Sequence, residues 1–241
     1  MLKIMICTFF FISVSCFGQE ICDNGIDDDG DGLIDINDSD CLCNPEPVPS
    51  IIANSSFEEM SQCPWSFSQL HYSVGWIQAS VPTTDYQNTC GLVFQSVLEA
   101  GLVPFPNGNG IAGGTIKNGY REYLGTCLTS PMLAGTTYRL TFNIASVSST
   151  NEGSTCDGGT IFYEPIPITL YGNSNCSQLP IDNAWQNPNA TDPTWFVIGS
   201  AYYEPASSWQ ELTITFTPLQ DINTIILGAP EYVPESYDNS Y

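Results

Sequence analysis

The amino-acid sequence predicts an all-β jelly-roll sandwich that follows a small, irregular acidic segment. Residues 138–144 and 212–217 alternate strictly between apolar and polar side chains, as strands with one buried face do. Many further short apolar runs are separated by Gly, Pro and Asn, and no long segment has helical periodicity. Aromatic residues make up 12% of the chain, which is ample for a core between two sheets.

Residues 1–18 have the features of a secretory signal peptide. Lys3 precedes an apolar run at residues 4–14, and small residues follow it. The run is shorter than the roughly 20 apolar residues that span a bilayer. We expect a mature chain that begins near Gln19, has no membrane span and is exported to the cell surface or the extracellular medium. Cleavage before Cys16, with lipid attached to that residue, is the alternative.

The cysteine count predicts disulfide bonds. Ten cysteines minus the two in the signal peptide leave eight, an even number typical of exported chains. Cys22 and Cys41 bracket the acidic segment closely enough to favour a bridge, whereas the other pairs stay open. A zinc site is the competing interpretation, but Cys41 and Cys43 have no matching second pair and the single histidine, His71, is remote in sequence.

Negative charge is concentrated near the N-terminus. The chain has 26 acidic and 4 basic residues, for a net charge of −22, which argues against nucleic acid as a partner. Nine of the 26 acids lie between Glu20 and Asp40.

The spacing of these acids is that of a calcium-binding loop. Gly32 occupies loop position 6, where a sharp turn is needed, and Ile34 is expected to pack inward. Calcium prefers six to eight oxygen ligands, and alternate residues of a curled loop can point inward together. The predicted ligands, with Leu33 acting through its carbonyl, are Asp27, Asp29, Asp31, Leu33, Asp35 and Asp38. Because Asp38 is shorter than the usual Glu, we expect a weak site, with a dissociation constant of about 10⁻⁴ to 10⁻³ M.

Residues 19–44 form a motif without the helices that flank an EF-hand loop. The Cys22–Cys41 string resembles the cysteine-flanked, Asp-rich metal-binding repeats of bacterial surface proteins and is similar to thrombospondin type 3 repeats. In those families calcium replaces a hydrophobic core. The alternative is an unstructured acidic spacer, although such runs rarely keep Gly and Ile at these loop positions.

A proline-rich linker at residues 45–50 separates this motif from a β domain at residues 51–241. Residues 92–102 are expected to form a short helix. Besides the two alternating runs, the expected strands are residues 51–57, 110–116, 122–127, 161–171, 194–201 and 224–228.

The β domain resembles the galactose-binding-like jelly rolls of secreted proteins from gliding bacteria, which include many carbohydrate-binding modules. The resemblance rests on residues 54–58, 75–76, 119–124, 131–138 and 209–218. It implies carbohydrate binding or adhesion, a last strand that this chain lacks, and further C-terminal domains of a longer protein. It also implies a second metal site, for which Glu58 matches the early acidic ligand.

Glycan binding requires exposed aromatic faces with polar partners beside them. Trp185 stands out because its neighbours are polar and loop-like. The full set of candidates is Trp76, Tyr120, Arg121, Asn183, Trp185, Gln186 and Trp195. Glu122, next to Arg121, indicates an ion pair or a polar ligand contact.

Catalysis is the less favoured class. One histidine limits triad chemistry, and His71 is expected to be structural or exposed. A glycan hydrolase needs only two placed carboxyl groups, for which the candidates are Asp85, Glu99, Glu122, Asp157 and Glu164, but no spacing favours any pair. The sequence thus predicts an exported, non-enzymatic calcium-binding protein with a carbohydrate-binding or adhesion domain; the alternative is a passive spacer in a large surface adhesin.

Overall fold

The computed structural model describes residues 50–147, 165–181, 187–235 and 238–240, the last range by its backbone. Residues 50–241 belong to one compact unit. The predicted signal peptide and the Asp-rich motif lie outside the described residues.

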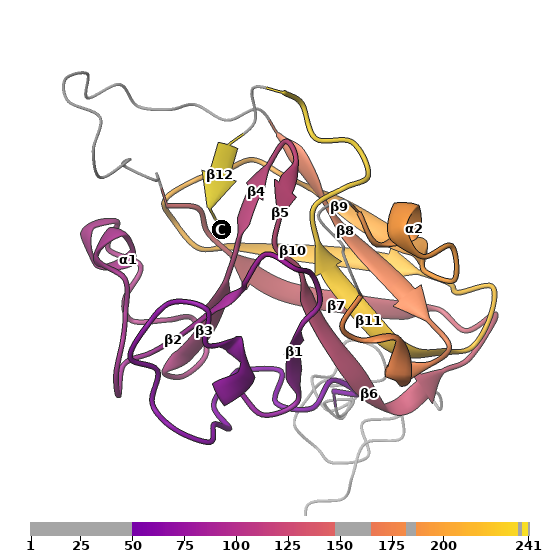
Figure 1. Ribbon diagram of the computed structural model, residues 1–241, viewed down its shortest axis with the longest axis horizontal. Coiled ribbons are helices and arrows are strands. Elements are labelled where there is room, and N and C mark those ends of the chain that lie inside the picture. The colour runs from indigo at the N-terminus through magenta and orange to yellow at the C-terminus, as the bar shows by residue number, and fades with distance from the viewer. Residues whose placement is uncertain (1–49, 148–164, 182–186, 236–237, 241) are drawn as a thin grey trace, which may run out of the picture. The chain divides into compact units, whose positions relative to one another are not determined.

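Twelve strands and a few short helices are present in the described part of the chain (Figure 1). The strands are β1 (Trp76–Gln78), β2 (Asp85–Asn88), β3 (Gly110–Gly113), β4 (Thr115–Lys117), β5 (Tyr120–Arg121), β6 (Leu124–Met132), β7 (Tyr138–Ile144), β8 (Ile166–Asn173), β9 (Phe196–Tyr203), β10 (Gln210–Phe216), β11 (Ile222–Gly228) and β12 (Asp238–Ser240). The helices are η2 (Leu70–Tyr72), α1 (Gln95–Glu99), η3 (Cys176–Gln178) and α2 (Pro188–Thr191). The predicted all-β class is therefore confirmed, and no helix among these residues is long and apolar enough to cross a membrane.

The largest sheet has five antiparallel strands in the order β1-β6-β11-β8-β9, and the antiparallel pair β7-β10 packs over it. Ile214 of β10 lies in one apolar cluster with Leu170 of β8 and Ile225 of β11. β10 also approaches β9 closely, because a Cβ atom on Gly199 would stand 2.6 Å from Ile214 Cγ2. The alternating residues of β7 and β10 thus bury their apolar face against the sheet.

The second face of the five-stranded sheet is buried as well. Ile226, the neighbour of Ile225 on β11, belongs to a different cluster that contains Tyr171 and Trp195. The Tyr171 hydroxyl donates a hydrogen bond of 2.9 Å to the carbonyl of Ala229. Side chains from both faces of β8 and β11 are therefore buried, which explains why these strands are apolar in nearly every position.

Smaller sheets complete the domain. β2 pairs with β3, and β4 pairs with both β5 and β12. β2, β3 and α1 lie toward the left of Figure 1, and β8, β9 and β11 toward the right. Disulfide bonds join Cys63 to Cys90 and Cys127 to Cys176, as the cysteine count predicts for these four residues.

The alternating run at residues 138–144 is β7 with the predicted bounds, and the run at 212–217 is β10 with shifted ends. The prediction of a strand at residues 51–57 is wrong, because only Ile52 makes an isolated bridge there. Asn54 and Phe57 have φ angles of 51° and 61°, and the Asn54 side chain bonds to Glu59 and Val74. These local side-chain bonds favour a turn over a ladder.

Candidate functional site: a cleft beside the small sheets

A cleft of about 870 Å³ lies beside β2, β3 and β4, with α1 and the end of β7 also contributing to its wall. Its volume is in the range of small-molecule sites in proteins. Aromatic and aliphatic side chains make up much of the lining, and Ser, Thr, Asn and Gln side chains stand between them. Among the described residues the lining contains three acidic side chains, Asp85, Glu99 and Glu122, and no Lys, Arg or His.

Glu122 is the most enclosed of these acids. It is 4% exposed, and its Oε2 atom accepts a hydrogen bond of 2.7 Å from the Thr115 amide. Its Oε1 atom accepts a hydrogen bond of 3.0 Å from the Tyr120 hydroxyl, which also lines the cleft. Burial raises the pKa of Glu122 to about 7, and burial together with the Glu122 charge raises the pKa of Tyr120 to about 12.

Asp85 is the first residue of β2 and is half-buried. Its Oδ1 atom accepts a hydrogen bond of 2.6 Å from the Ser68 amide. Burial raises the pKa of Asp85, and the Ser68 hydrogen bond acts in the opposite direction.

An aromatic pair lies at the cleft beside these acids. Phe67 is 66% exposed, and its ring centroid is 4.6 Å from that of Phe94, the residue that precedes α1. Trp65, on the same loop, is 70% exposed. The loop is held in place by buried Gln69, whose Oε1 atom accepts hydrogen bonds from the Trp65 and Ser66 amides, and by the Cys63–Cys90 disulfide. Aromatic faces are thus presented on a fixed backbone.

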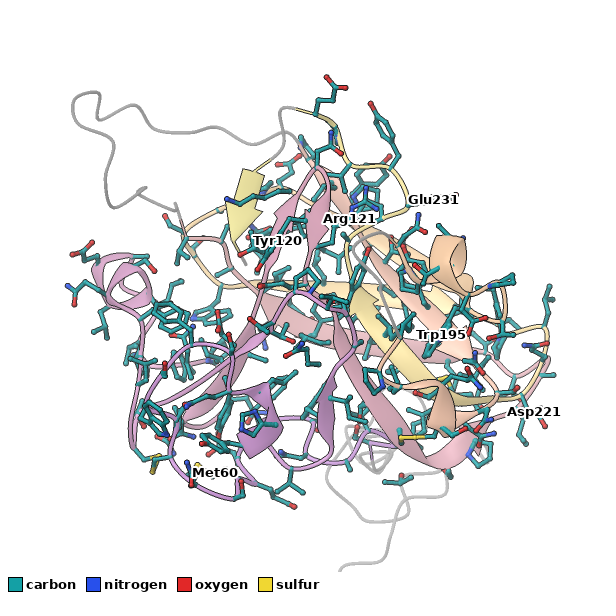
Figure 2. All side chains as sticks on the ribbon, in the orientation of Figure 1. Met60, Tyr120, Arg121, Trp195, Asp221 and Glu231 are labelled. Atoms are coloured by element: carbon teal, nitrogen blue, oxygen red, sulfur yellow. A yellow bond between two sulfur atoms is a disulfide. The ribbon has the colours of Figure 1, made fainter. Side chains whose placement is uncertain are left out.

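Residues 120–123, which lead from β5 to the start of β6, divide between two environments. Tyr120 and Glu122 face the cleft, whereas Arg121 Nη1 donates a hydrogen bond of 3.1 Å to the carbonyl of Glu231. Figure 2 shows Arg121 on the side of β5 that faces Glu231, with Tyr120 on the other side. Arg121 and Glu122 therefore bond to different partners on opposite sides of the backbone, and not to each other as an ion pair, which was one of the two expectations for Glu122.

Two of the predicted glycan-binding residues are therefore placed away from the cleft. Arg121 is buried and bonded to backbone carbonyls, and Trp195 is 1% exposed within the core. The prediction that either side chain contacts a ligand is wrong. Residues 230–231 cover Arg121, and core side chains surround Trp195. Tyr120 does line the cleft.

Trp76 is half-buried and packs against its neighbours. Its ring stacks on Phe57 with 4.6 Å between centroids, and its Nε1 atom donates to the carbonyl of Asn54. With exposed His71, it lines a separate groove of about 640 Å³ along β1. The predicted residues Asn183, Trp185 and Gln186, the six calcium ligands, and Asp157 and Glu164 lie outside the described residues.

Glu58, the predicted second metal ligand, accepts backbone hydrogen bonds. Its Oε1 atom accepts from the amides of Asn109, at 2.6 Å, and Gly110, at 2.8 Å. In the described part of the chain, no three His, Cys, Asp or Glu side chains cluster closely enough to hold a metal ion.

Sequence reasoning missed Phe67 and Phe94. The available signal was the loop composition around Trp65 and Phe67, where Pro and Ser residues follow Cys63. Phe94 gave no such signal, because its contact with Phe67 joins residues 27 positions apart.

No protein-family model matches this chain, and no curated protein sequence matches it either.

Proposed function

We propose that this chain is an exported, calcium-binding surface protein whose β domain binds a neutral glycan in the cleft. The observation that carries this proposal is the composition of the cleft lining: aromatic rings, hydrogen-bonding side chains and no described cation. Sugar rings have apolar faces that stack on aromatic side chains and hydroxyl groups that bond to polar ones.

The charge of the cleft supports a neutral ligand. The Asp85 and Glu99 carboxylates would repel uronate or sulfate groups, and no cation among the described lining residues would offset them. The same carboxyl and amide oxygens accept hydrogen bonds from the hydroxyl groups of an uncharged sugar.

A galactose-binding-like jelly roll is the finer fold that we propose for the domain. The five-stranded antiparallel sheet with a second layer over one face supports it. We further propose that calcium organises the segment from Asp27 to Asp38, as the ligand spacing supports. In the alternative function, a passive spacer within a surface adhesin, the cleft would bind no glycan.

Binding of the full-length mature chain to neutral polysaccharides is the decisive experiment. The panel contains β-1,3-glucan, β-1,4-glucan, xylan, mannan and galactan, with alginate as the anionic comparison, each measured with calcium and with chelator. We expect binding to at least one neutral polymer and none to alginate. A folded protein that binds nothing would instead support the spacer function.

Phe67→Ala locates the binding site. We expect about a fivefold loss of affinity, since an aromatic stacking contact contributes about 1 kcal/mol, with little change in melting temperature because Phe67 is exposed. Tyr202→Ala is the matched control, because Tyr202 is equally exposed, at 74%, and lies on β9. Equal affinities of the two variants would place the glycan elsewhere.

Asp31→Ala tests the calcium loop separately. We expect a calcium affinity at least tenfold weaker than that of the wild type, because the variant removes a direct ligand. An unchanged calcium affinity would refute the loop assignment without bearing on the cleft.

A further inference from the structure

Two of the cleft's carboxyl groups are brought together by one short stretch of backbone. Asp85 is the register partner of Gly113 at the end of β3, and the Glu122 amide donates a hydrogen bond of 3.0 Å to the carbonyl of Thr115 at the start of β4. Gly113 and Thr115 flank Gly114. Asp85 and Glu122 are therefore attached to opposite ends of a three-residue segment.

Gly114 permits this close approach. A Cβ atom at position 114 would stand 3.0 Å from Glu122 Cβ and 3.3 Å from Thr84 Cγ2, the residue before Asp85. Absence of a side chain thus lets β2 and Glu122 converge on the same wall of the cleft, where both carboxyl groups line the ligand space.

The two carboxyl groups have different surroundings. Each carboxyl group accepts a backbone amide hydrogen bond, Glu122 from Thr115 and Asp85 from Ser68, but Glu122 is almost completely buried whereas Asp85 is more exposed. Pairs of acids whose environments separate their proton affinities are the usual arrangement of an acid and a base in one site. Burial has the largest effect on the pKa of Glu122 and raises it, the charge of Asp85 raises it further, and the hydrogen bonds from Tyr120 and Thr115 lower it.

We infer that this cleft hydrolyses a glycosidic bond of the neutral glycan that it binds, with Glu122 as the general acid and Asp85 as the general base. Protonated Glu122 transfers its proton to the glycosidic oxygen as the bond from that oxygen to the anomeric carbon breaks. A water molecule adds to the anomeric carbon and gives its proton to the Asp85 carboxylate. Asp85 then returns a proton to Glu122 through solvent, so one water is consumed for each bond cleaved.

This activity differs from the non-enzymatic protein that the sequence favours. The single histidine argues against triad chemistry but not against glycoside hydrolysis, because two carboxyl groups suffice for that reaction. What the linear sequence lacks is the placement of Asp85 and Glu122, which are 37 positions apart.

The variants that test this inference keep a hydrogen-bond partner at each contact, although Glu122→Gln reverses the direction of the bond with Tyr120. In Glu122→Gln the amide oxygen accepts from the Thr115 amide, and the amide nitrogen donates to the Tyr120 hydroxyl oxygen. In Asp85→Asn the amide oxygen accepts from the Ser68 amide. Glu211→Gln on β10 is the matched control, because Glu211 is exposed and is not among the cleft-lining residues.

Release of reducing ends from the five neutral polysaccharides is measured with the full-length mature chain, alongside binding of the same polymers. We expect the wild type and Glu211→Gln to release reducing ends at equal rates. Glu122→Gln and Asp85→Asn are each expected to lose about 10²- to 10⁴-fold in rate while they keep glycan affinity within a fewfold of the wild type. The wild-type rate should fall as the pH rises above about 7, because Glu122 then loses its proton.

The inferred hydrolysis rests on the proposed glycan binding. Different experimental outcomes would overturn the hydrolysis alone or both proposals. Binding without release of reducing ends, or release that survives Glu122→Gln and Asp85→Asn, would overturn the hydrolytic role and leave glycan binding intact. No binding to any of the neutral polymers by a folded protein would overturn both.

Discussion

The segment from Tyr120 to Tyr123 contributes to two regions with contrasting chemistry. On the cleft side, Tyr120 and Glu122 face a cavity that is bordered by several aromatic rings, among them exposed Phe67. On the opposite side, which we call the sealed side, Arg121 bonds to the carbonyl of Glu231 and Tyr123 packs against Tyr171 and Gly228. Both sides contain aromatic and ionisable residues, so composition does not distinguish a ligand site from a core.

What distinguishes the two sides is whether another segment covers them. Residues 229–231 supply carbonyl groups to Tyr171 and Arg121 on the sealed side. On the cleft side, the Cys63–Cys90 loop and α1 border the cavity and leave it open. Aromatic side chains that another segment covers contribute to the free energy of unfolding. Those that no segment covers remain accessible to a ligand.

The largest expected effect on this comparison comes from removing one tryptophan on the sealed side and one on the loop that carries Phe67. Trp195→Ala should lower the free energy of unfolding by about 4 kcal/mol, because it leaves a large cavity in the core. Trp65→Ala should change it by less than about 0.5 kcal/mol, because Trp65 is exposed. Chemical denaturation measures both changes in the free energy of unfolding. Similar changes would show that the two tryptophans are equally buried, which would contradict the comparison.

Removal of each disulfide tests the same comparison, because only one of the two bonds lies in the loop that carries Phe67. Replacing Cys63 and Cys90 with Ala should lower the free energy of unfolding by about 3 kcal/mol and also weaken glycan binding, because the loop that presents Phe67 loses its tether. Replacing Cys127 and Cys176 should destabilise the protein at least as much, since that bond closes a longer loop, yet leave glycan affinity unchanged below the melting temperature. Weakened binding in the second variant alone would contradict this division.

The third prediction concerns the pH dependence of stability. The folded state holds the Glu122 proton more tightly than the unfolded state, because the pKa of this group is raised from 4.5 to about 7. Its contribution is therefore complete below pH 4.5 and is lost as the pH rises through about 7, a loss of about 3 kcal/mol. Asp85 acts in the same direction, since its pKa is also raised.

Glu122→Gln isolates this contribution. Denaturation of the wild type and the variant at pH 4.5 and at pH 8 should show a wild-type decrease that exceeds that of the variant by about 3 kcal/mol. Arg121 faces the sealed side and does not offset the charge of Glu122, so parallel pH profiles for the two proteins would mean that the buried carboxylate has a partner that this account lacks.

The alternation of apolar and polar residues correctly predicted the strands that have one buried and one exposed face. Residues 138–144 and 212–217 alternate because each lies in a two-layer sandwich with water on one side, and both are strands that pair with each other. The predicted strand at residues 51–57 failed because Asn54 makes side-chain bonds to Glu59 and Val74, and the sequence pattern does not reveal such bonds.

By itself the sequence determined the all-β class, several strands and the disulfide bonding of the four cysteines that the structure describes. These properties follow from neighbouring residues and composition, which remain visible in one dimension. Only the tertiary structure decided that Trp195 is buried while Phe67 is exposed, and that Asp85 and Glu122, on either side of Gly114, line the same cleft. Whether a side chain is buried, and which side chains lie close together, depends on the segment that packs against each face. That packing is made by contacts between residues tens of positions apart, which a local sequence pattern does not reveal.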